Sequence, residues 1–267
     1  MINYKTTNST GLITINRPNV KNALDIDTLT QLRESLISAR DDQLIKVIII
    51  TGGGDDSFCA GADLVKATKN SKASYAEAIF QETNQAVLNG IYIRLMDLTD
   101  IKLYKPLIAA INGYCLGGGL ELALQADIRI ASKNATFGLP ESKVASIPAI
   151  SGLHRLLKAV PPAHAMKMAL TGKSVDSKKA HEIGLVSDVY EKEELIAEAL
   201  KIADDIASNG PLATQALKKL SIATAHLSDV DAQHLTELYW GILRDTEDRL
   251  EGRKAFAEKR SPIYKGK

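Results

Sequence analysis

The chain has 267 residues, of which 45% are hydrophobic and 24% charged, with a formal net charge of +1. A chain of this size and composition can bury a large core without disulfides or metals, and its balanced charge gives no sign of a nucleic-acid partner. We expect no membrane span and no secretory leader, because no apolar run approaches about 20 residues and the N-terminus lacks a signal pattern.

The beginning of the chain alternates strand patterns with a helix pattern. Residues 2–5 and 11–16 have strand patterns, and residues 27–41 have the pattern of a helix that Asp27 can cap. One face of this helix carries the apolar residues Leu29, Leu32, Leu36 and Ala39. Residues 47–50 form a short apolar run typical of a strand that is buried on both faces.

A second succession of strand, glycine turn, helix and strand follows further along. Residues 74–97 are helical in pattern, and residues 107–112 form another apolar strand run. A glycine-rich turn over 113–119 then leads into a helical pattern at 120–126 and a strand pattern at 128–131. This repeated alternation of strands and helices predicts an α/β fold.

From about residue 162 the chain becomes almost entirely helical in pattern. Met166, Ala169 and Leu170 have helical spacing, and residues 186–189 form one last strand pattern. Three further helices are predicted, over 193–208, 211–225 and 231–257. We therefore divide the chain into a core over residues 1–195 and a helical region over residues 196–267. A helical region of this size cannot easily close a core of its own, so we expect it to pack on a neighbour or on another subunit.

Several common site types do not fit this sequence. The loop Gly52-x-Gly54-x-x-Ser57 lacks the last glycine of the dinucleotide fingerprint, and neither a P-loop lysine nor a Gly-x-Ser-x-Gly elbow occurs. The five histidines form no ligand pair, so we expect no metal. Cys59 and Cys115 have no redox or metal spacing, which favours reduced thiols in a cytoplasmic protein.

The second glycine loop is more informative. Gly117-Gly118-Gly119 opens a helix whose first turn carries Glu121, and free N–H groups at such a point favour an oxyanion. A matching donor can come from the loop Ala60-Gly61-Ala62-Asp63. Glu141 also lies among apolar residues, where a carboxylate is costly unless it has a partner or a function. Taken singly, each glutamate has an ordinary explanation, as a complement to the helix dipole or as a surface acid.

Ordered segments along nearly the whole chain carry a family resemblance. The segments are Asn16-Arg17-Pro18, Asn22-Ala23-Leu24, Phe58 to Leu64, Lys105 to Tyr114, Gly117 to Ala123, Ala135 to Glu141, Leu170-Thr171-Gly172, Gly184-Leu185-Val186 and Phe256 to Pro262. Together they resemble the crotonase superfamily of enoyl-CoA hydratases and isomerases. The resemblance implies a crotonase-like spiral of β-β-α repeats followed by a helical C-terminal trimerisation region.

The resemblance also assigns residues to an acyl-CoA site. The oxyanion hole would be formed by the backbone N–H groups of Ala62 and Gly118, which would hold the thioester carbonyl and stabilise an enolate. Positions that match the CoA and substrate site are Lys21, Ala23, Ala60, Asp63, Leu64, Gly117, Pro140 and Ala149. From the tail, Phe256 and Lys259 would close it. No metal, flavin or nicotinamide is implied, because CoA enters as part of the substrate.

Hydratases of the family use two glutamates, whereas its isomerases typically keep only the later one. Glu121 and Glu141 fill both positions and are 20 residues apart, as in the hydratases. The resemblance therefore implies an enoyl-CoA hydratase in which the pair holds one water between them, with one carboxylate as base and the protonated partner as acid. The alternatives are an enoyl-CoA isomerase and a carnitinyl-CoA dehydratase-like member. The dehydratase is favoured by Leu139-Pro140-Glu141 and Val160-Pro161-Pro162.

Two departures from the family pattern concern the acyl group. After Ile147-Pro148 the hydratases usually have small residues, but this chain has Ala149 and Ile150. The span from Asp63 to Pro106 is also long for the family. The bulk of Ala149 and Ile150 argues against a short straight-chain acyl group as the best substrate. The longer span is expected to change the range of acyl groups that fit, and the alternative is an extended surface helix.

The expected partners are an acyl-CoA thioester and further copies of the chain, in a homotrimer or a dimer of trimers. A remote alternative is a non-catalytic relative that binds RNA through a lysine-rich early helix. The helix over 27–41 has only Arg33 and Arg40 as cations and ends in Asp41-Asp42, which disfavours that alternative. We expect a cytoplasmic enzyme that binds neither nucleic acid nor membranes.

Overall fold

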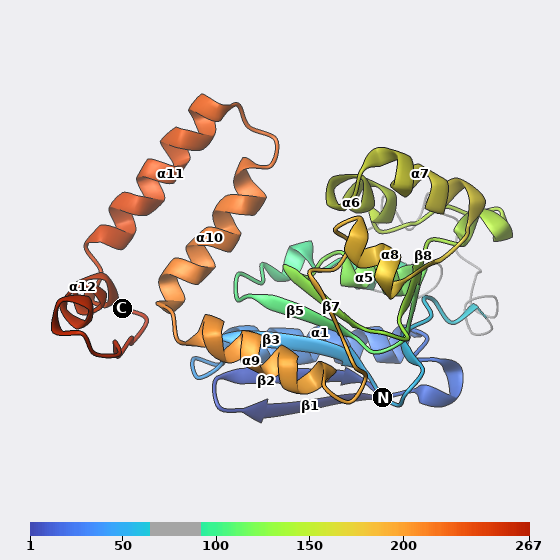
Figure 1. Cartoon of the computed structure of the whole chain (residues 1–267), viewed down its shortest axis with the longest axis horizontal. Coiled ribbons are helices and arrows are strands. Elements are labelled where there is room, and N and C mark those ends of the chain that lie inside the picture. The colour runs from blue at the N-terminus through green and yellow to red at the C-terminus, as the bar shows by residue number, and fades with distance from the viewer. Residues whose placement is uncertain (65–91) are drawn as a thin grey trace.

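Two β-sheets form the centre of the molecule in the computed structural model, which describes residues 1–64 and 92–267 (Figure 1). The larger sheet has the order β1-β2-β3-β5-β7-β10, with strands at Ile2–Thr7, Thr10–Ile15, Val47–Gly52, Leu107–Ile111, Ile128–Ser132 and Asp188–Tyr190. β1 and β2 pair antiparallel and the other neighbours pair parallel. The predicted α/β class is confirmed, and the last strand begins two residues later than its pattern indicated.

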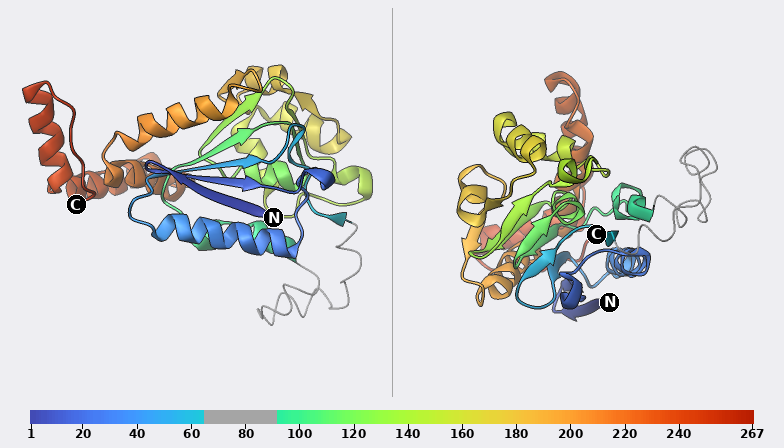
Figure 2. Two further views of the ribbon diagram at one scale, coloured as in Figure 1. Left: turned by 90° about the horizontal axis from the view of Figure 1, so that it is seen from below. Right: turned by 90° about the vertical axis from the view of Figure 1, so that its right-hand side faces the viewer.

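Helices cover both faces of the larger sheet, which explains why β3 is apolar along its length (Figure 2). Ile48 and Ile50 point into the core cluster that contains the apolar face of α1 (Ile26–Asp41). Val47 and Ile49 point to the opposite side and pack with α9 (Leu195–Ala207). Successive strand residues face opposite sides, so a strand between two helical layers must be apolar at every position. The predicted face of α1 is confirmed, since all four of its residues are fully buried.

The cap of α1 differs from the sequence-based prediction. Asp25 is the capping residue, because its extended backbone precedes the helix and its carboxylate accepts a hydrogen bond from the Thr28 N–H at 2.9 Å. Asp27 lies in the first helical turn, so its prediction as the cap is wrong. A cap of this kind contributes about 1 kcal/mol to helix stability.

The smaller sheet was not predicted as a sheet, although two of its strands lead into the loops that contain Ala62 and Gly118. Its order is β4-β6-β8-β9, with strands at Ser57–Cys59, Tyr114–Leu116, Thr136–Gly138 and Val175–Asp176. The segment predicted only as a turn, residues 113–119, contains β6 and the first residues of α5 (Gly118–Ala123). Strands of two or three residues next to glycines have too little periodicity for a sequence pattern to reveal them.

Short helices complete the core around α5. They are α6 (Gly152–Ala159), α7 (Pro162–Thr171), α8 (Ser177–Glu182) and the 3-10 turns Pro18–Val20, Tyr92–Met96, Thr99–Ile101 and Glu141–Val144. α6 and α7 lie beside α5 at the end of the core remote from the C-terminus (Figure 1). Most of the helix predicted over 74–97 lies outside the described residues.

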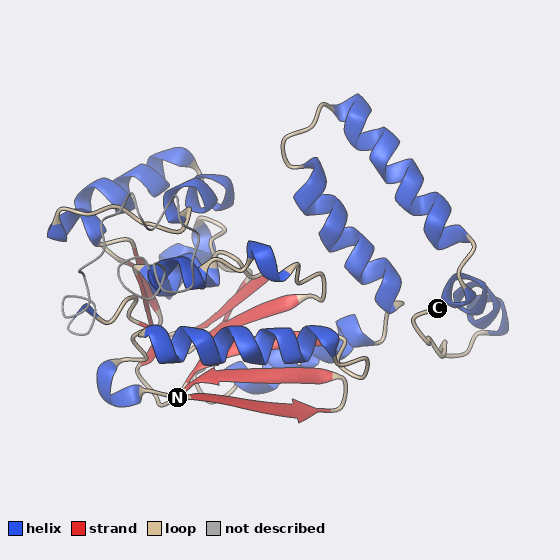
Figure 3. Ribbon diagram, turned by 180° about the vertical axis from the view of Figure 1, so that it is seen from behind, coloured by secondary structure: helices blue, strands red, loops and turns tan. Residues whose placement is uncertain are grey.

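The chain ends in a helical arm, by which we mean α10 (Pro211–Thr224), α11 (Asp229–Arg244) and α12 (Glu247–Glu258). The arm projects away from the sheets (Figure 3). The prediction of a single helix over 231–257 is wrong, because α11 ends at Arg244 and a second helix begins shortly after it. Thr246 caps this second helix, α12, by accepting a hydrogen bond from the Arg249 N–H. Large apolar side chains on the arm are exposed, including Leu217, Leu238, Trp240, Ile242 and Leu250.

The predicted division at residues 195 and 196 falls at the start of α9. This helix packs on the larger sheet through Leu195, Ala199 and Ala203, and the projecting arm begins only at α10. None of the helices formed by the described residues has the length and apolar character needed to cross a membrane.

Candidate active site

Two backbone loops meet at the ends of β4 and β6. A methyl group placed on Gly119 would lie 2.1 Å from the carbonyl oxygen of Cys59, and one placed on Gly118 would lie 3.5 Å from the Cα of Gly61. Gly61 itself has φ +96°, a conformation that side-chain-bearing residues rarely adopt. The glycines of both loops are therefore required for the two backbones to touch, as at any point of close backbone approach.

The contact brings the two predicted oxyanion donors to one place. Ala62 follows Gly61 directly, and Gly118 is the first residue of α5. Neither N–H donates a hydrogen bond within the part of the chain that the structure describes. Two adjacent N–H groups without partners suit an oxygen that gains negative charge.

The loop that carries Ala62 is held from the other side by Leu24 and Arg17. The Leu24 N–H donates to the Gly61 carbonyl at 2.8 Å, and the Asp63 N–H donates to the Leu24 carbonyl at 2.9 Å. The Arg17 guanidinium pairs with Asp63 at 3.1 Å and with Asp25 at 3.2 Å. Asp63, one of the predicted CoA-site residues, thus also anchors the loop through its carboxylate.

Glu121 is a buried carboxylate with backbone donors of its own. Its side chain is 2% exposed, and Oε1 accepts hydrogen bonds from the N–H groups of Ile150 at 2.6 Å and Gly152 at 3.0 Å. Burial raises the pKa of Glu121, while these backbone donors, a further one at Ala149 and the positive charge of Arg155 oppose the rise. The donors and the positive charge limit the effect of burial without reversing it, so the pKa of Glu121 remains above its ordinary value.

Glu141 has a different environment. It begins a 3-10 turn beside Gly117, where a methyl group would lie 3.2 Å from its Oε1. Its Oε2 is buried without a hydrogen-bond partner. Burial, together with the negative charge of Glu121, raises the pKa of Glu141 to about 7, against one opposing backbone hydrogen bond.

The two glutamates therefore differ in their proton affinity at one site. Glu121 has fixed donors that favour its carboxylate, whereas Glu141 has a bare oxygen and a pKa near neutrality. Two titratable groups with environments that differ in this way suit an acid and a base of one reaction. An unpartnered Oε2 is also the kind of atom that a water or a substrate proton would satisfy.

The other predicted site residues fall into two groups. Residues close to the two loops or to the glutamates are Lys21, Ala23, Ala60, Leu64, Gly117, Pro140 and Ala149. Among them Lys21 is held by its carbonyl, which accepts from the Ala60 N–H, and its ammonium lies 4.7 Å from the Tyr114 ring centre. Phe256 belongs to α12 and Lys259 directly follows it, and α12 lies far from α5, the helix that carries Glu121 (Figure 1).

The residues that depart from the family pattern near the acyl site differ in their exposure to solvent. Ala149 is exposed, whereas Ile150 is buried and belongs to the main core cluster. The longer span after Asp63 lies mostly outside the described residues. Only Ala149 of the two substitutions thus presents its side chain to solvent.

Three residues near the site were not identified from the sequence. Gly152 approaches so closely that a methyl group there would lie 2.6 Å from the Cγ of Glu121. Tyr92 has a buried hydroxyl without a partner, and burial together with Asp63 and Asp25 raises its pKa to about 12. Arg155 acts on Glu121 by its charge. Of the three, only Gly152 could have been identified from the sequence, because it follows the Ile147-Pro148 segment at a position where the family has glycine.

The first glycine loop has a structural function. The Asn112 side chain donates to the carbonyls of Gly52 and Gly54, and the Asn22 side chain donates to those of Gly53 and Ser57. The carbonyl groups of this loop are thus occupied by hydrogen bonds from side chains of the same protein. Both cysteines are buried free thiols, and the described residues contain no group of three His, Cys, Asp or Glu side chains arranged to hold a metal.

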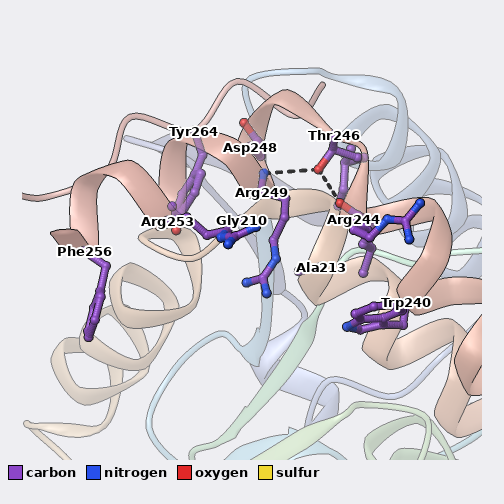
Figure 4. A pocket seen from close by; sticks show the side chains of 13 residues that line it. Gly210, Ala213, Trp240, Arg244, Thr246, Asp248, Arg249, Arg253, Phe256 and Tyr264 are labelled. Carbon is purple, nitrogen blue, oxygen red and sulfur yellow. Dashed lines mark hydrogen bonds between the residues drawn. The ribbon is translucent and has the colours of Figure 1, made fainter.

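A cavity of about 610 Å³ lies on the arm and is lined mainly by residues of α10, α11 and α12 (Figure 4). Its lining includes Trp240, Arg249, Arg253 and Phe256. Its acid, Asp248, already accepts from the N–H groups of the tail residues 265 and 266. The cavity thus has no acid and base pair comparable to that of the glutamates.

Known proteins are similar to this chain over nearly its whole length. A family model described as enoyl-CoA hydratase/isomerase matches residues 5–267. The chain is 41% identical to the (E)-benzylidenesuccinyl-CoA hydratase of Thauera aromatica over 99% of both chains. It is 40% identical to the carnitinyl-CoA dehydratase of Proteus mirabilis, over 96% of this chain and 94% of that one. A solved structure of an enoyl-CoA hydratase from Bacillus anthracis has a TM-score of 0.89 and 34% identity, covering 100% of this chain and 99% of that one. The similarity therefore includes both the core and the arm.

Proposed function

The chain belongs to the enoyl-CoA hydratase/isomerase family, and from that premise we propose that it adds water reversibly to a 2-enoyl-CoA thioester, using Glu121 and Glu141. The observation that carries this proposal is a pair of carboxylates beside two unpaired backbone donors. Glu121 is fully buried and accepts backbone hydrogen bonds, whereas Glu141 is partly buried and has an oxygen without a partner. Isomerisation needs only one acid–base group, so the buried second glutamate favours hydration.

In the proposed reaction the N–H groups of Ala62 and Gly118 bind the thioester oxygen. Negative charge moves to that oxygen when water attacks Cβ, and each donor aimed at it is worth roughly 3–4 kcal/mol. Glu121, as carboxylate, takes a proton from the water while the new C–O bond forms. Glu141, as acid, gives its proton to Cα and collapses the enolate. The starting state returns when the proton on Glu121 passes through solvent to Glu141.

The raised pKa of Glu141 supports this division of labour. A group with a pKa of about 7 is half protonated near neutral pH and can both give and take a proton there. Glu121 is held by fixed N–H donors, which stabilise its anion. No step in this scheme requires a metal, flavin or nicotinamide, and CoA arrives with the substrate.

A second candidate is the same reaction run as a dehydration of a 3-hydroxyacyl-CoA with a polar or bulky group at Cβ. The Leu139-Pro140-Glu141 triplet and the similarity to a carnitinyl-CoA dehydratase favour it. The relative that hydrates (E)-benzylidenesuccinyl-CoA favours a bulky Cβ substituent equally. We therefore place substituted acyl groups ahead of short straight chains.

We further propose a homotrimer or a dimer of trimers in the cytoplasm. The exposed apolar side chains of the arm support assembly, because a free chain would leave them in water. Phe256 is 87% exposed and remote from the glutamates of its own chain. If Phe256 and Lys259 close a CoA site as the resemblance implies, they do so on a neighbouring subunit.

The test is hydration of a panel of straight-chain, branched, aromatic and charged 2-enoyl-CoA thioesters by the wild type and by Glu121→Gln and Glu141→Gln. We expect each variant to lower kcat by roughly 10²- to 10⁴-fold, the range of general acid–base catalysis. The exposed Glu193→Gln is the matched control and should keep full activity. Full activity in both site variants would refute the proposal. Migration of a 3-enoyl-CoA double bond that survives Glu121→Gln but not Glu141→Gln would favour an isomerase.

A further inference from the structure

The side chain of Met96 lies in the corner between the two loops that carry the predicted oxyanion donors. A methyl group placed on Gly118 would lie 2.7 Å from Met96 Cε, 3.3 Å from Met96 Sδ and 3.5 Å from the Cα of Gly61. These three atoms therefore lie around one point, which is the position that a side chain of residue 118 would take. The Met96 thioether fills the space beside that point, and Met96 is 0% exposed.

The backbone around Met96 is bonded to two helices. The Met96 carbonyl accepts from the side-chain amide of Gln125, just beyond α5, at 3.0 Å, and Gln125 Oε1 accepts from the Leu98 N–H at 2.9 Å. From α1, the guanidinium of Arg33 donates to the carbonyl of Asp97 at 2.7 Å. The Met96 side chain is therefore presented to the two loops by a backbone that is tied to both α1 and the end of α5.

A thioether at this corner acts by its volume. Sulfur is a weak hydrogen-bond acceptor, so Met96 leaves the N–H of Gly118 available to a substrate oxygen. Met96 belongs to the main core cluster, where a shortened side chain leaves a cavity that the surrounding backbone fills only in part by moving. Movement of a catalytic group by about 1 Å can cost about 100-fold in rate. The loops that would move here are those of Gly61 and Gly118.

We propose that Met96 is a positioning residue for the oxyanion hole, whose buried thioether packs between the loops of Gly61 and Gly118 and fixes the distance between the N–H groups of Ala62 and Gly118. This inference rests on the proposed function, which assigns these two N–H groups to the thioester oxygen. Negative charge on that oxygen develops mainly in the transition state. Loss of Met96 therefore affects kcat more than KM.

The experiment measures kcat and KM for hydration of the 2-enoyl-CoA thioester on which the wild type is most active. Met96→Ala should lower kcat about 100-fold and change KM by less than about threefold. Met96→Leu keeps most of the volume, so kcat should stay within about fivefold of the wild type. Leu195→Ala is the matched control, since it shortens a buried side chain on the opposite face of the larger sheet and should leave kcat unchanged.

A second measurement tests the contact between Met96 and Gly118 directly. In Gly118→Ala the added methyl group meets Met96, so kcat should fall. In the double variant Met96→Ala/Gly118→Ala this methyl group occupies vacated space, and kcat should recover at least about threefold relative to Met96→Ala. Losses of kcat that simply multiply in the double variant would overturn the proposal. A Met96→Ala protein that is less stable but keeps the wild-type kcat would overturn it too.

Met96→Val replaces Met96→Ala if the alanine variant does not fold. A fall in kcat of at least about tenfold with KM retained then supports the proposal, and a smaller fall overturns it. Failure of the proposed function has a different signature, which is full activity of Glu121→Gln and Glu141→Gln whatever residue occupies position 96.

Discussion

Around Glu121 and Glu141 the backbones are packed so closely that glycines are needed, whereas on the arm large apolar side chains stand in solvent. A methyl group on Gly119 would collide with the Cys59 carbonyl, but one on Gly241 of α11 would meet nothing within 4 Å. Trp240, next to Gly241, is 58% exposed. The site depends on backbone positions fixed within one chain, while the arm has apolar surface to offer to another chain.

The largest expected effect tests this contrast at two glycines. Gly119→Ala should destabilise the fold by about 3 kcal/mol through overpacking and lower kcat/KM at least about 100-fold, because both donor loops must shift. Gly241→Ala is the matched control and should be neutral or stabilising by up to about 1 kcal/mol in its helix. Chemical unfolding and hydration assays measure both. Equal effects of the two substitutions would contradict the contrast.

A smaller effect concerns pH and the proton on Glu141. Because the pKa of Glu141 is raised to about 7, its acid form is present below that pH and lost above it. Hydration by the proposed route should therefore decline about tenfold per pH unit above its basic limb. In the folded protein Glu141 binds its proton more tightly than in the unfolded chain, so its contribution favours folding below about pH 4.5 and is lost as pH rises towards 7.

The measurement is the pH dependence of kcat/KM and of the unfolding free energy. Glu141→Gln should remove the basic limb and reduce the loss of stability between pH 4.5 and 7, leaving the smaller contribution of Glu121. The exposed Glu193→Gln should change neither. An unchanged stability curve in Glu141→Gln would show that Glu141 has an ordinary proton affinity.

Substitutions on the arm are expected to have the smallest effect on the stability of the core. Leu238 and Ile242 are exposed one helical turn apart on α11, so the double substitution Leu238→Glu and Ile242→Glu should leave core folding intact. Sedimentation should show conversion of the proposed trimer to smaller species. Leu44→Glu, on an exposed apolar residue of the core, should leave the assembly unchanged. Persistence of the wild-type assembly in the α11 variant would mean that this part of the arm lies outside the subunit interface.

Sequence patterns alone predicted the α/β class, the buried strands, the apolar face of α1 and the grouping of two glutamates with the loops at Gly61 and at Gly117 to Gly119. These features are local, since strand and helix periodicity and glycine turns are present in consecutive residues. The short strands of the smaller sheet and the break between α11 and α12 escaped, because a few residues give no period and a cap acts through geometry.

The difference between the two glutamates arises from contacts that form only in the folded protein. Glu121 and Glu141 are the same residue in similar apolar settings, and no sequence pattern shows that one accepts backbone N–H groups from residues 150 and 152 while the other keeps a bare oxygen. The proton affinity of each glutamate depends on its burial and on charged groups that are distant in sequence but close in the fold, such as Arg155 for Glu121. The acid and the base therefore become distinct only when α5, α6 and the turn at Glu141 are brought together.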